Sequence, residues 1–388
     1  MASRSPETED ATGLSDWLRL TLIPGIGGES QRKLLAAFGL PQHVFAAGHL
    51  AQRQIIASKA DLLTEAHNAA LDEKIAATLA WAEKPDCHII TLADKRYPPQ
   101  LLEIPDPPTL LYVRGNPATL SCPGIAVVGS RNATPQGCKI AEDFARTLAD
   151  AGFVIISGLA LGIDAAAHNG ALTSRTRQAE NTIAVIGTGA DRLYPARNQA
   201  LAQRIVECGA IVSEFPLGTP AIAANFPRRN RVISGLARGV LVVEAATESG
   251  SLITARLAGE QGREVFAIPG SIHSPFSRGC HRLIRQGAKL VESAQDILEE
   301  LTGAYPTPPA PEPEPPSPTS APDAAASDEE SRVLAQLGHD LCTLDELALR
   351  TALPADTLLA LLLNLELEGQ IATLPGNRYQ RIYGYGKK

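Results

Sequence analysis

The sequence predicts an α/β fold in which a doubly wound, mainly parallel sheet is flanked by a small N-terminal helical domain and a C-terminal module. Apolar runs such as IAVV at 125–128 and VLVV at 240–243 are continuous rather than alternating, as is typical of strands buried on both faces. Helix-length amphipathic segments separate most of these runs, and such strand–helix–strand units build parallel sheets.

The N-terminal domain is predicted over residues 1–85, because apolar residues recur there at helical spacing and β-branched runs are almost absent. Residues 86–302 are predicted to form the α/β domain. Its expected strands cover residues 88–92, 110–114, 125–129, 154–157, 183–187, 211–214, 240–244, 265–268 and 289–291. Residues 303–327 contain nine prolines and predict an extended linker, because proline lacks the backbone N–H that regular structure uses.

The C-terminal module, residues 328–388, is expected to resemble a winged helix, with three helices and a hairpin-like tail. The helices are predicted over residues 327–337, 343–351 and 355–369, and Thr343 with Glu346 forms a capping box at the start of the second. The third helix has no Lys or Arg, which is unfavourable for a helix that reads a DNA groove. The tail, however, is basic and contains Arg378, Arg381, Lys387 and Lys388. We therefore expect weak DNA contact through the wing, or a protein-binding role.

Composition excludes several classes of protein. No apolar stretch is long enough to cross a bilayer, and the acidic N-terminus does not resemble a secretion signal, so we expect a cytoplasmic protein without membrane insertion. Six cysteines without a CxxC pair indicate neither a disulfide framework nor a zinc site. The net charge of −7 argues against a surface that is basic throughout, so any site for a polyanion has to be local.

The segments that follow the predicted strands are rich in Gly, Ser and Arg. In parallel sheets ligands bind outside the carboxyl ends of the strands, where helix N-termini favour phosphate oxygens. Six arginines fall in these segments: Arg131, Arg192, Arg197, Arg228, Arg229 and Arg231. The start of the helix after residue 244 adds Ser249 and Ser251. We expect a phosphate-binding edge, although each turn could also serve only as a tight connection that caps its helix.

Aromatic residues in the same segments could stack on bases. Tyr194, Phe215 and Phe226 lie there, although each could instead be buried in the core. No nucleotide-hydrolase P-loop, HExxH or GxSxG pattern is present, and no cofactor or metal is predicted. Asp164 and His168, four residues apart on a helix, are interpreted as a helix cap and a buried histidine rather than an acid/base pair.

At these segments the sequence resembles the DNA processing protein A (DprA/Smf) family of bacterial natural transformation. The matching segments are GSRNATPQG, SGLALGIDAAAH, IGTGADRLYPARN, SEFPLG, NFPRRNRVISGLARGVLVVEA, SGSLITARLAGEQGREVFAIPG and LIRQGAKLV, within residues 125–291. The resemblance implies an extended Rossmann-like domain that binds single-stranded DNA, forms a homodimer and helps to load the RecA recombinase onto incoming strands during competence. The site residues that it carries over are Gly129, Ser130, Arg131, Asn225, Phe226, Arg228, Arg229 and Arg231. Members often have a basic residue directly after the Tyr-Pro of the third segment, where this chain has Ala196 followed by Arg197.

Three alternatives stay open. Residues 22–28, LIPGIGG, resemble a helix-hairpin-helix whose turn amides hold a DNA phosphate, but such a turn can also simply join two packed helices; the family implies a sterile-alpha-motif-like domain here. The rival function is a hydrolase of nucleoside monophosphates that uses Glu244 or Glu248, although its PGGxGT turn is replaced here by residues 248–251. A third possibility is a scaffold for recombination factors that does not use the arginines.

Overall fold

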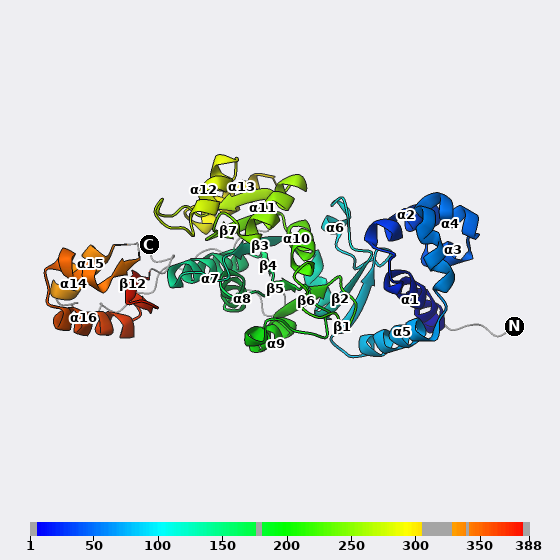
Figure 1. Cartoon of the computed structure of the whole chain (residues 1–388), viewed down its shortest axis with the longest axis horizontal. Helices are drawn as coiled ribbons and strands as arrows, with labels where there is room; N and C mark the ends of the chain where they lie inside the picture. The colour runs from blue at the N-terminus through cyan, green and yellow to red at the C-terminus, as the bar shows by residue number, and fades with distance from the viewer. Residues whose placement is uncertain (1–5, 176–180, 305–327, 339–340, 383–388) are drawn as a thin grey trace.

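The computed structural model describes residues 6–175, 181–304, 328–338 and 341–382. These residues form an N-terminal group of helices, a central sheet with helices on both faces, and a C-terminal group of helices (Figure 1). The predicted linker at 303–327 lies outside the described residues except for its first two positions, which end a helix. Within the described ranges, no helix combines the length and apolarity that crossing a membrane requires.

The N-terminal domain is helical, as predicted. Its helices are α1 (Pro6–Leu22), α2 (Gly28–Phe38), α3 (Pro41–Ala46), α4 (His49–Ile56) and α5 (Ala69–Ala82), with a 3-10 segment η1 (Ala57–Glu65). Their buried residues, among them Leu18 and Leu34, share one cluster with Leu110 and Tyr112 of the central sheet. The rings of Trp81 and Tyr112 meet edge to face with centroids 6.0 Å apart. This shared core fixes the helical domain against the sheet edge.

The central sheet has the order β1-β2-β6-β5-β4-β3-β7-β8-β9. Its strands are β1 (Cys87–Thr91), β2 (Leu110–Gly115), β3 (Gly124–Gly129), β4 (Val154–Ser157), β5 (Thr182–Val185), β6 (Gly209–Ser213), β7 (Gly239–Val243), β8 (Glu264–Ala267) and β9 (Lys289–Leu290). All neighbours from β6 to β9 pair in parallel, whereas β2 runs antiparallel to both β1 and β6. The sheet is therefore mainly parallel, as the continuous apolar runs predict.

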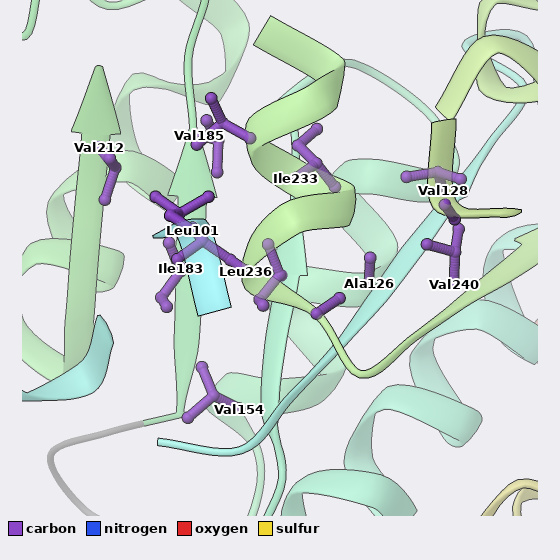
Figure 2. Close-up of a cluster of buried hydrophobic side chains, with 14 of the residues drawn as sticks. Leu101, Ala126, Val128, Val154, Ile183, Val185, Val212, Ile233, Leu236 and Val240 are labelled. Carbon is purple, nitrogen blue, oxygen red and sulfur yellow. The ribbon is translucent and has the colours of Figure 1, made fainter. Parts of the chain in front are cut away.

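Helices cover both faces of this sheet. One face holds α6 (Pro99–Leu102), α10 (Asn225–Leu236), α11 (Gly250–Glu260) and α12 (Arg278–Arg285); the other holds α7 (Pro135–Asp150), α8 (Ile163–Leu172), α9 (Gln199–Cys208) and α13 (Ala294–Ala304). Ala126 and Val128 of β3 join the cluster on the first face, whereas Ile125 and Val127 join the cluster on the second. Figure 2 shows the first cluster, in which α10 packs on the strands through Ile233 and its neighbours.

The C-terminal module has the arrangement of a winged helix. It comprises α14 (Asp328–Leu337), α15 (Leu344–Thr351) and α16 (Ala355–Leu367), with strands β10 (Cys342–Thr343), β11 (Ile371–Leu374) and β12 (Arg378–Arg381). The strands pair antiparallel in the order β10-β12-β11. The predicted capping box is present, because the Thr343 side chain accepts from the Glu346 N–H while the Glu346 carboxylate accepts from the Thr343 N–H. Lys387 and Lys388 lie outside the described residues.

Candidate nucleic-acid interface

The carboxyl ends of β3, β4, β5 and β7 are bordered by one cavity of about 670 Å³, which we call the main cavity. Its position follows from the topology, because parallel strands end at the same edge of a sheet and their connecting turns meet there. Of the predicted site residues, the main cavity is lined by Gly129, Ser130, Arg131, Phe226, Arg229, Ser249 and Ser251. Gly129 and Ser251, which are 122 positions apart in the sequence, thus come together at one site, as expected for the ends of parallel strands.

Arg131 lies exposed on the rim of the main cavity beside two aromatic rings. Its guanidinium carbon is 5.7 Å from the centroid of the Phe226 ring. The Phe226 ring in turn lies 5.8 Å from that of Tyr194, which is 51% exposed. Among the residues that the structure describes, no carboxylate forms an ion pair with Arg131. A cation and two accessible rings are the groups that hold a phosphate and stack on bases.

The N-terminus of α11 borders the same cavity. Ser249 caps the helix, and its hydroxyl accepts from the Ser251 N–H at 3.3 Å and lies 2.7 Å from the Ser251 hydroxyl. The first-turn amides and the positive end of the helix dipole favour an anion at this position. Glu248, which is exposed and also lines the cavity, carries the opposite charge. An anion is therefore better placed on the Ser251 side of this helix start than on the Glu248 side.

Glu244 fixes both ends of the turn that carries Arg131. Its backbone carbonyl accepts from the Ser130 N–H at 2.7 Å, and its carboxylate accepts from the Thr134 N–H at 2.8 Å and the Thr134 hydroxyl at 2.5 Å. A side chain at Gly137 would collide with this carboxylate, because a Cβ there would lie 2.3 Å from Glu244 Cδ. Burial raises the pKa of Glu244, although the hydrogen bonds from Thr134 oppose the shift.

The same contacts bear on the rival hydrolase. Glu244 is held by Thr134 and borders a different cavity, not the main one, so its carboxylate does not face a ligand in the main cavity. Sequence reasoning considered Glu244 only as an acid for catalysis and missed its structural contact with Thr134. The signal that could have identified this role is its position directly after β7, next to the Thr134 turn.

Arg229 differs from the prediction, because its guanidinium points into the protein. Arg229 is 5% exposed and donates through Nη1 to the carbonyl oxygens of Gly158, at 2.7 Å, and Val185. These carbonyls lie at the carboxyl ends of β4 and β5, where a buried acceptor requires a donor. Burial lowers the pKa of Arg229 to about 10, partly offset by the charge of Asp164. We correct the expectation that this guanidinium is free for phosphate: it supports the floor of the cavity.

Arg231 is corrected in the same way. Its Nε lies 2.8 Å from Asp106 Oδ2, and its Nη2 lies 2.5 Å from Glu214 Oε2. Two ion pairs therefore neutralise this side chain, because α10 brings it against the segment before β2 and the end of β6. Of the three arginines in the run at 228–231, only Arg228 remains exposed.

The remaining predicted residues lie around the main cavity rather than in it. Arg192 and Arg197 are exposed but do not line it, and Arg197 belongs to a 3-10 turn, η3 (Ala196–Asn198). Asn225 is buried and donates to the Gly187 carbonyl at 3.2 Å, so it anchors the start of α10. Arg228 lies over the ring of the buried Phe215, with its Cζ 5.4 Å from the ring centroid. Phe215 is thus a core residue and not an exposed stacking platform.

His168 is the buried, hydrogen-bonded histidine that the sequence predicts, but the expectation that Asp164 caps the helix is wrong: the N-cap of α8 is Gly162, and Asp164 binds the loop before the helix. Asp164 accepts from the Gly158 N–H at 3.1 Å and the Ala160 N–H at 3.3 Å. His168 is fully buried, and its Nδ1 lies 2.7 Å from the Thr182 hydroxyl. Burial and the nearby Arg229 lower the pKa of His168 to about 3, so the ring is neutral at physiological pH.

Family models of known proteins match both the central domain and the C-terminal module of this chain. The family model for DNA recombination-mediator protein A matches residues 88–302, and the model for the DprA winged helix domain matches residues 306–377. Protein Smf of Escherichia coli K12 is 42% identical over 368 residues, which cover 94% of this chain and 95% of that protein.

Two solved structures are similar. The X-ray structure of DNA processing protein A from Streptococcus pneumoniae has a TM-score of 0.64 and 38% identity, and the match covers 74% of this chain and 97% of that one. DNA processing protein A from Helicobacter pylori, whose structure is described in terms of its single-stranded DNA binding mode, has a TM-score of 0.50 and 32% identity over 56% of this chain and 97% of its own.

Proposed function

This chain belongs to the DNA recombination-mediator protein A family, and on that premise we propose that it binds single-stranded DNA in the main cavity. The observation that carries the proposal is the group formed by Arg131, Phe226 and Tyr194, which joins an unpaired cation to two aromatic rings beside the N-terminus of α11. The family relationship and the single-stranded DNA binding mode described for the Helicobacter pylori relative support it.

Each part of the cavity has a distinct task in this proposal. Arg131 and the first amides of α11 hold phosphates, because both present N–H donors with positive charge. Tyr194, which is half exposed, stacks on a base that has been freed from pairing, and Phe226 supports it from behind. Stacking does not distinguish the four bases, so binding has little sequence preference. Duplex DNA binds weakly, because its bases are already stacked on one another.

Binding is local, because the protein as a whole carries the same sign of charge as DNA. The chain has a net charge of −7, so a polyanion is repelled by the surface as a whole and attracted only at the strand ends. Each phosphate neutralised on a single strand contributes about −0.7 to the slope of log affinity against log salt. A small number of phosphate contacts therefore gives a shallow slope.

The finer functions follow from the resemblance to the family. We propose that the protein acts as a homodimer in the cytoplasm, protects single strands that enter during natural transformation, and helps RecA to load onto them. The description of the family as a recombination mediator supports this proposal. Its chemistry is non-covalent binding. Of the two carboxylates considered for a hydrolase, Glu244 is engaged by Thr134, and Glu248 is exposed at the main cavity but lacks the PGGxGT turn of such enzymes.

The C-terminal module favours a protein-binding role. Helix α16 exposes a row of apolar side chains, Leu359, Leu363 and Leu367, which are 46%, 57% and 79% exposed. They are spaced four residues apart and so share one face of the helix. Since α16 has no basic residue, this face is better suited to another protein than to phosphates.

The test of the proposed function is a comparison of single-stranded and duplex oligonucleotides of equal length by fluorescence anisotropy. We expect the single strand to bind more tightly, and Arg131→Gln to weaken it by about tenfold, the value of one charged hydrogen bond. Arg204→Gln, an exposed arginine on α9 away from the main cavity, is the matched control and should bind as the parent does. Equal affinity for the two forms of DNA, or no effect of Arg131→Gln, contradicts the proposal.

A further inference from the structure

A second, smaller cavity of about 180 Å³ lies where the N-terminal helical domain meets the central domain. We call it the junction cavity. Its walls come from the start of α2, from β2, from the segment after β6 and from α10. The residues that line it include Gly27, Gly28, Arg32, Tyr112, Arg228 and Arg231. The turn at residues 22–28, for which a helix-hairpin-helix is one of two open interpretations, therefore borders the same cavity as Arg228 and Arg231.

The start of α2 supplies uncapped amides to this cavity. The helix has 11 residues, and its N-cap, Gly27, makes no side-chain hydrogen bond to the first turn. A Cβ at Gly27 would meet no atom within 4 Å, so the approach to the helix end is open. The first N–H groups of an uncapped helix lack intrahelical acceptors and carry the positive end of the dipole.

A second and independent feature is a buried hydroxyl without a partner. Tyr112 lines the junction cavity and is 2% exposed, yet its hydroxyl makes no hydrogen bond within the described residues. The Nη1 group of Arg231, which lines the same cavity, is likewise buried without a partner. Buried donors are normally satisfied, so two of them beside one cavity indicate an acceptor that binds there.

The charges around the cavity favour an anion. Three guanidinium groups line it, from Arg32, Arg228 and Arg231. The opposing carboxylates are Glu214, which also lines the cavity and has one buried oxygen without a partner, and Asp106, and both pair with Arg231. Arg32 donates to the Pro107 carbonyl, at 3.2 Å, and Arg228 lies over the Phe215 ring. Within the part of the chain that the structure describes, neither of these two cations forms an ion pair, although the charge of Arg228 acts on Glu214.

We propose that the junction cavity binds one backbone phosphate of a single strand that extends beyond the main cavity. The inference rests on the proposed function and deepens it, because it makes the N-terminal helical domain part of the DNA path. The connection is α10: Phe226 at its start lines the main cavity, and Arg228 lines the junction cavity. The phosphate accepts from Arg32, Arg228 and the amides of α2, with the Tyr112 hydroxyl as a further donor.

The experiment measures affinity as a function of strand length. Oligothymidylates from about 4 to about 16 nucleotides, the range of site sizes that OB-folds show on single strands, are titrated into the full chain at several salt concentrations. The variants are Arg32→Gln, which removes one cation, and Tyr112→Phe, which removes only the hydroxyl. Arg53→Gln, an exposed arginine on α4 that does not line the cavity, is the matched control. Thermal unfolding confirms that each variant is folded.

We expect both variants to bind the shortest strand as the parent does and the longest strand about three- to tenfold more weakly. For Arg32→Gln the salt slope with the longest strand becomes shallower by about 0.7, since one phosphate contact is lost. The melting temperature of Tyr112→Phe is expected to stay unchanged or to rise, because the change removes a buried hydroxyl that has no partner. The Arg53→Gln control should follow the parent at every length.

The proposal is overturned if long strands bind Arg32→Gln and Tyr112→Phe as tightly as the parent while Arg131→Gln still has a lower affinity for strands of every length. The strand then binds in the main cavity only. If Arg131→Gln binds strands of every length as tightly as the parent does, the proposed function itself is contradicted. Thymidine monophosphate serves as a separate probe in calorimetric titration. Should it bind in an Arg32-dependent way while strand length has no effect, the cavity takes a free nucleotide and not a strand phosphate, which also overturns the proposal.

Discussion

Replacing Glu244 by alanine should loosen the turn that carries Arg131. The substitution removes the acceptor of two hydrogen bonds from Thr134, at 2.8 and 2.5 Å, and leaves the buried Thr134 N–H without a partner. Hydrogen bonds to charged groups contribute about 1.5–3 kcal/mol each, and part of this is recovered by water, so we expect a loss of about 3 kcal/mol in the free energy of unfolding. Domains are stable by only about 5–15 kcal/mol, so the loss is readily measured.

Two further substitutions separate the hydrogen bonds from backbone strain. Glu244 has a φ of 50°, a left-handed conformation that costs a residue with a Cβ about 1–2 kcal/mol. Glu244→Gly loses the same hydrogen bonds as Glu244→Ala but relieves this strain, so it should be more stable than the alanine variant by about 1 kcal/mol. Glu244→Gln keeps an oxygen acceptor for the Thr134 N–H and should lose the least.

The assays are urea unfolding followed by circular dichroism, amide hydrogen exchange of residues 129–134, and single-strand affinity. Exchange in this turn should accelerate in Glu244→Ala, and affinity should fall by up to about tenfold, the full contribution of one charged contact from Arg131. The reasoning is refuted if Glu244→Ala unfolds at the same urea concentration as the parent and binds single strands equally well.

Three other predictions concern the floor of the cavity, acid stability and α16. Gly158→Ala should disrupt binding and lower stability by about 2 kcal/mol or more, because its Cβ would lie 2.5 Å from Arg229 Nη1; unaltered melting and affinity would contradict this. Because burial lowers the pKa of His168 from 6.5 to about 3, the unfolded chain binds a proton that the folded protein excludes. The free energy of unfolding should therefore fall as the pH drops from about 6.5 towards 3, by at most about 1.4 kcal/mol per pH unit. Urea unfolding at several pH values should show that His168→Gln lacks this contribution to the slope of the unfolding free energy against pH. An identical slope in the variant and the parent would argue against this origin. Leu363→Glu should leave thermal stability and affinity for both single and duplex DNA unchanged, because its side chain is 57% exposed on a face that we assign to a protein partner; a marked loss of DNA affinity would place that face on DNA instead.

The sequence predicts the elements of the fold well, because each depends on local pattern. Continuous apolar runs mark β3 and β7, and Thr343 with Glu346 marks the start of α15 through a contact three residues apart. The meeting of Arg131 and Phe226 is also predictable, since the turns of a parallel sheet converge at its carboxyl edge.

Burial and pairing of individual side chains are not predictable in this way. Arg228, Arg229 and Arg231 look equivalent in sequence, yet α10 turns the first outward, the second onto strand-end carbonyls and the third onto two carboxylates. Which one is free depends on how α10 rotates against the sheet. The contact of Glu244 with Thr134 and the unpartnered hydroxyl of Tyr112 likewise depend on tertiary packing between segments far apart in the sequence.

The central claim is that exposed cations at the strand ends, and not the arginines buried beneath them, neutralise the phosphates of a single strand. The most direct measurement is the slope of log affinity against log salt for a single-stranded oligonucleotide, in the parent, Arg131→Gln and the Arg204→Gln control. We predict that the slope becomes shallower by about 0.7 in Arg131→Gln and stays unchanged in the control. A slope that is the same in all three proteins would contradict the account.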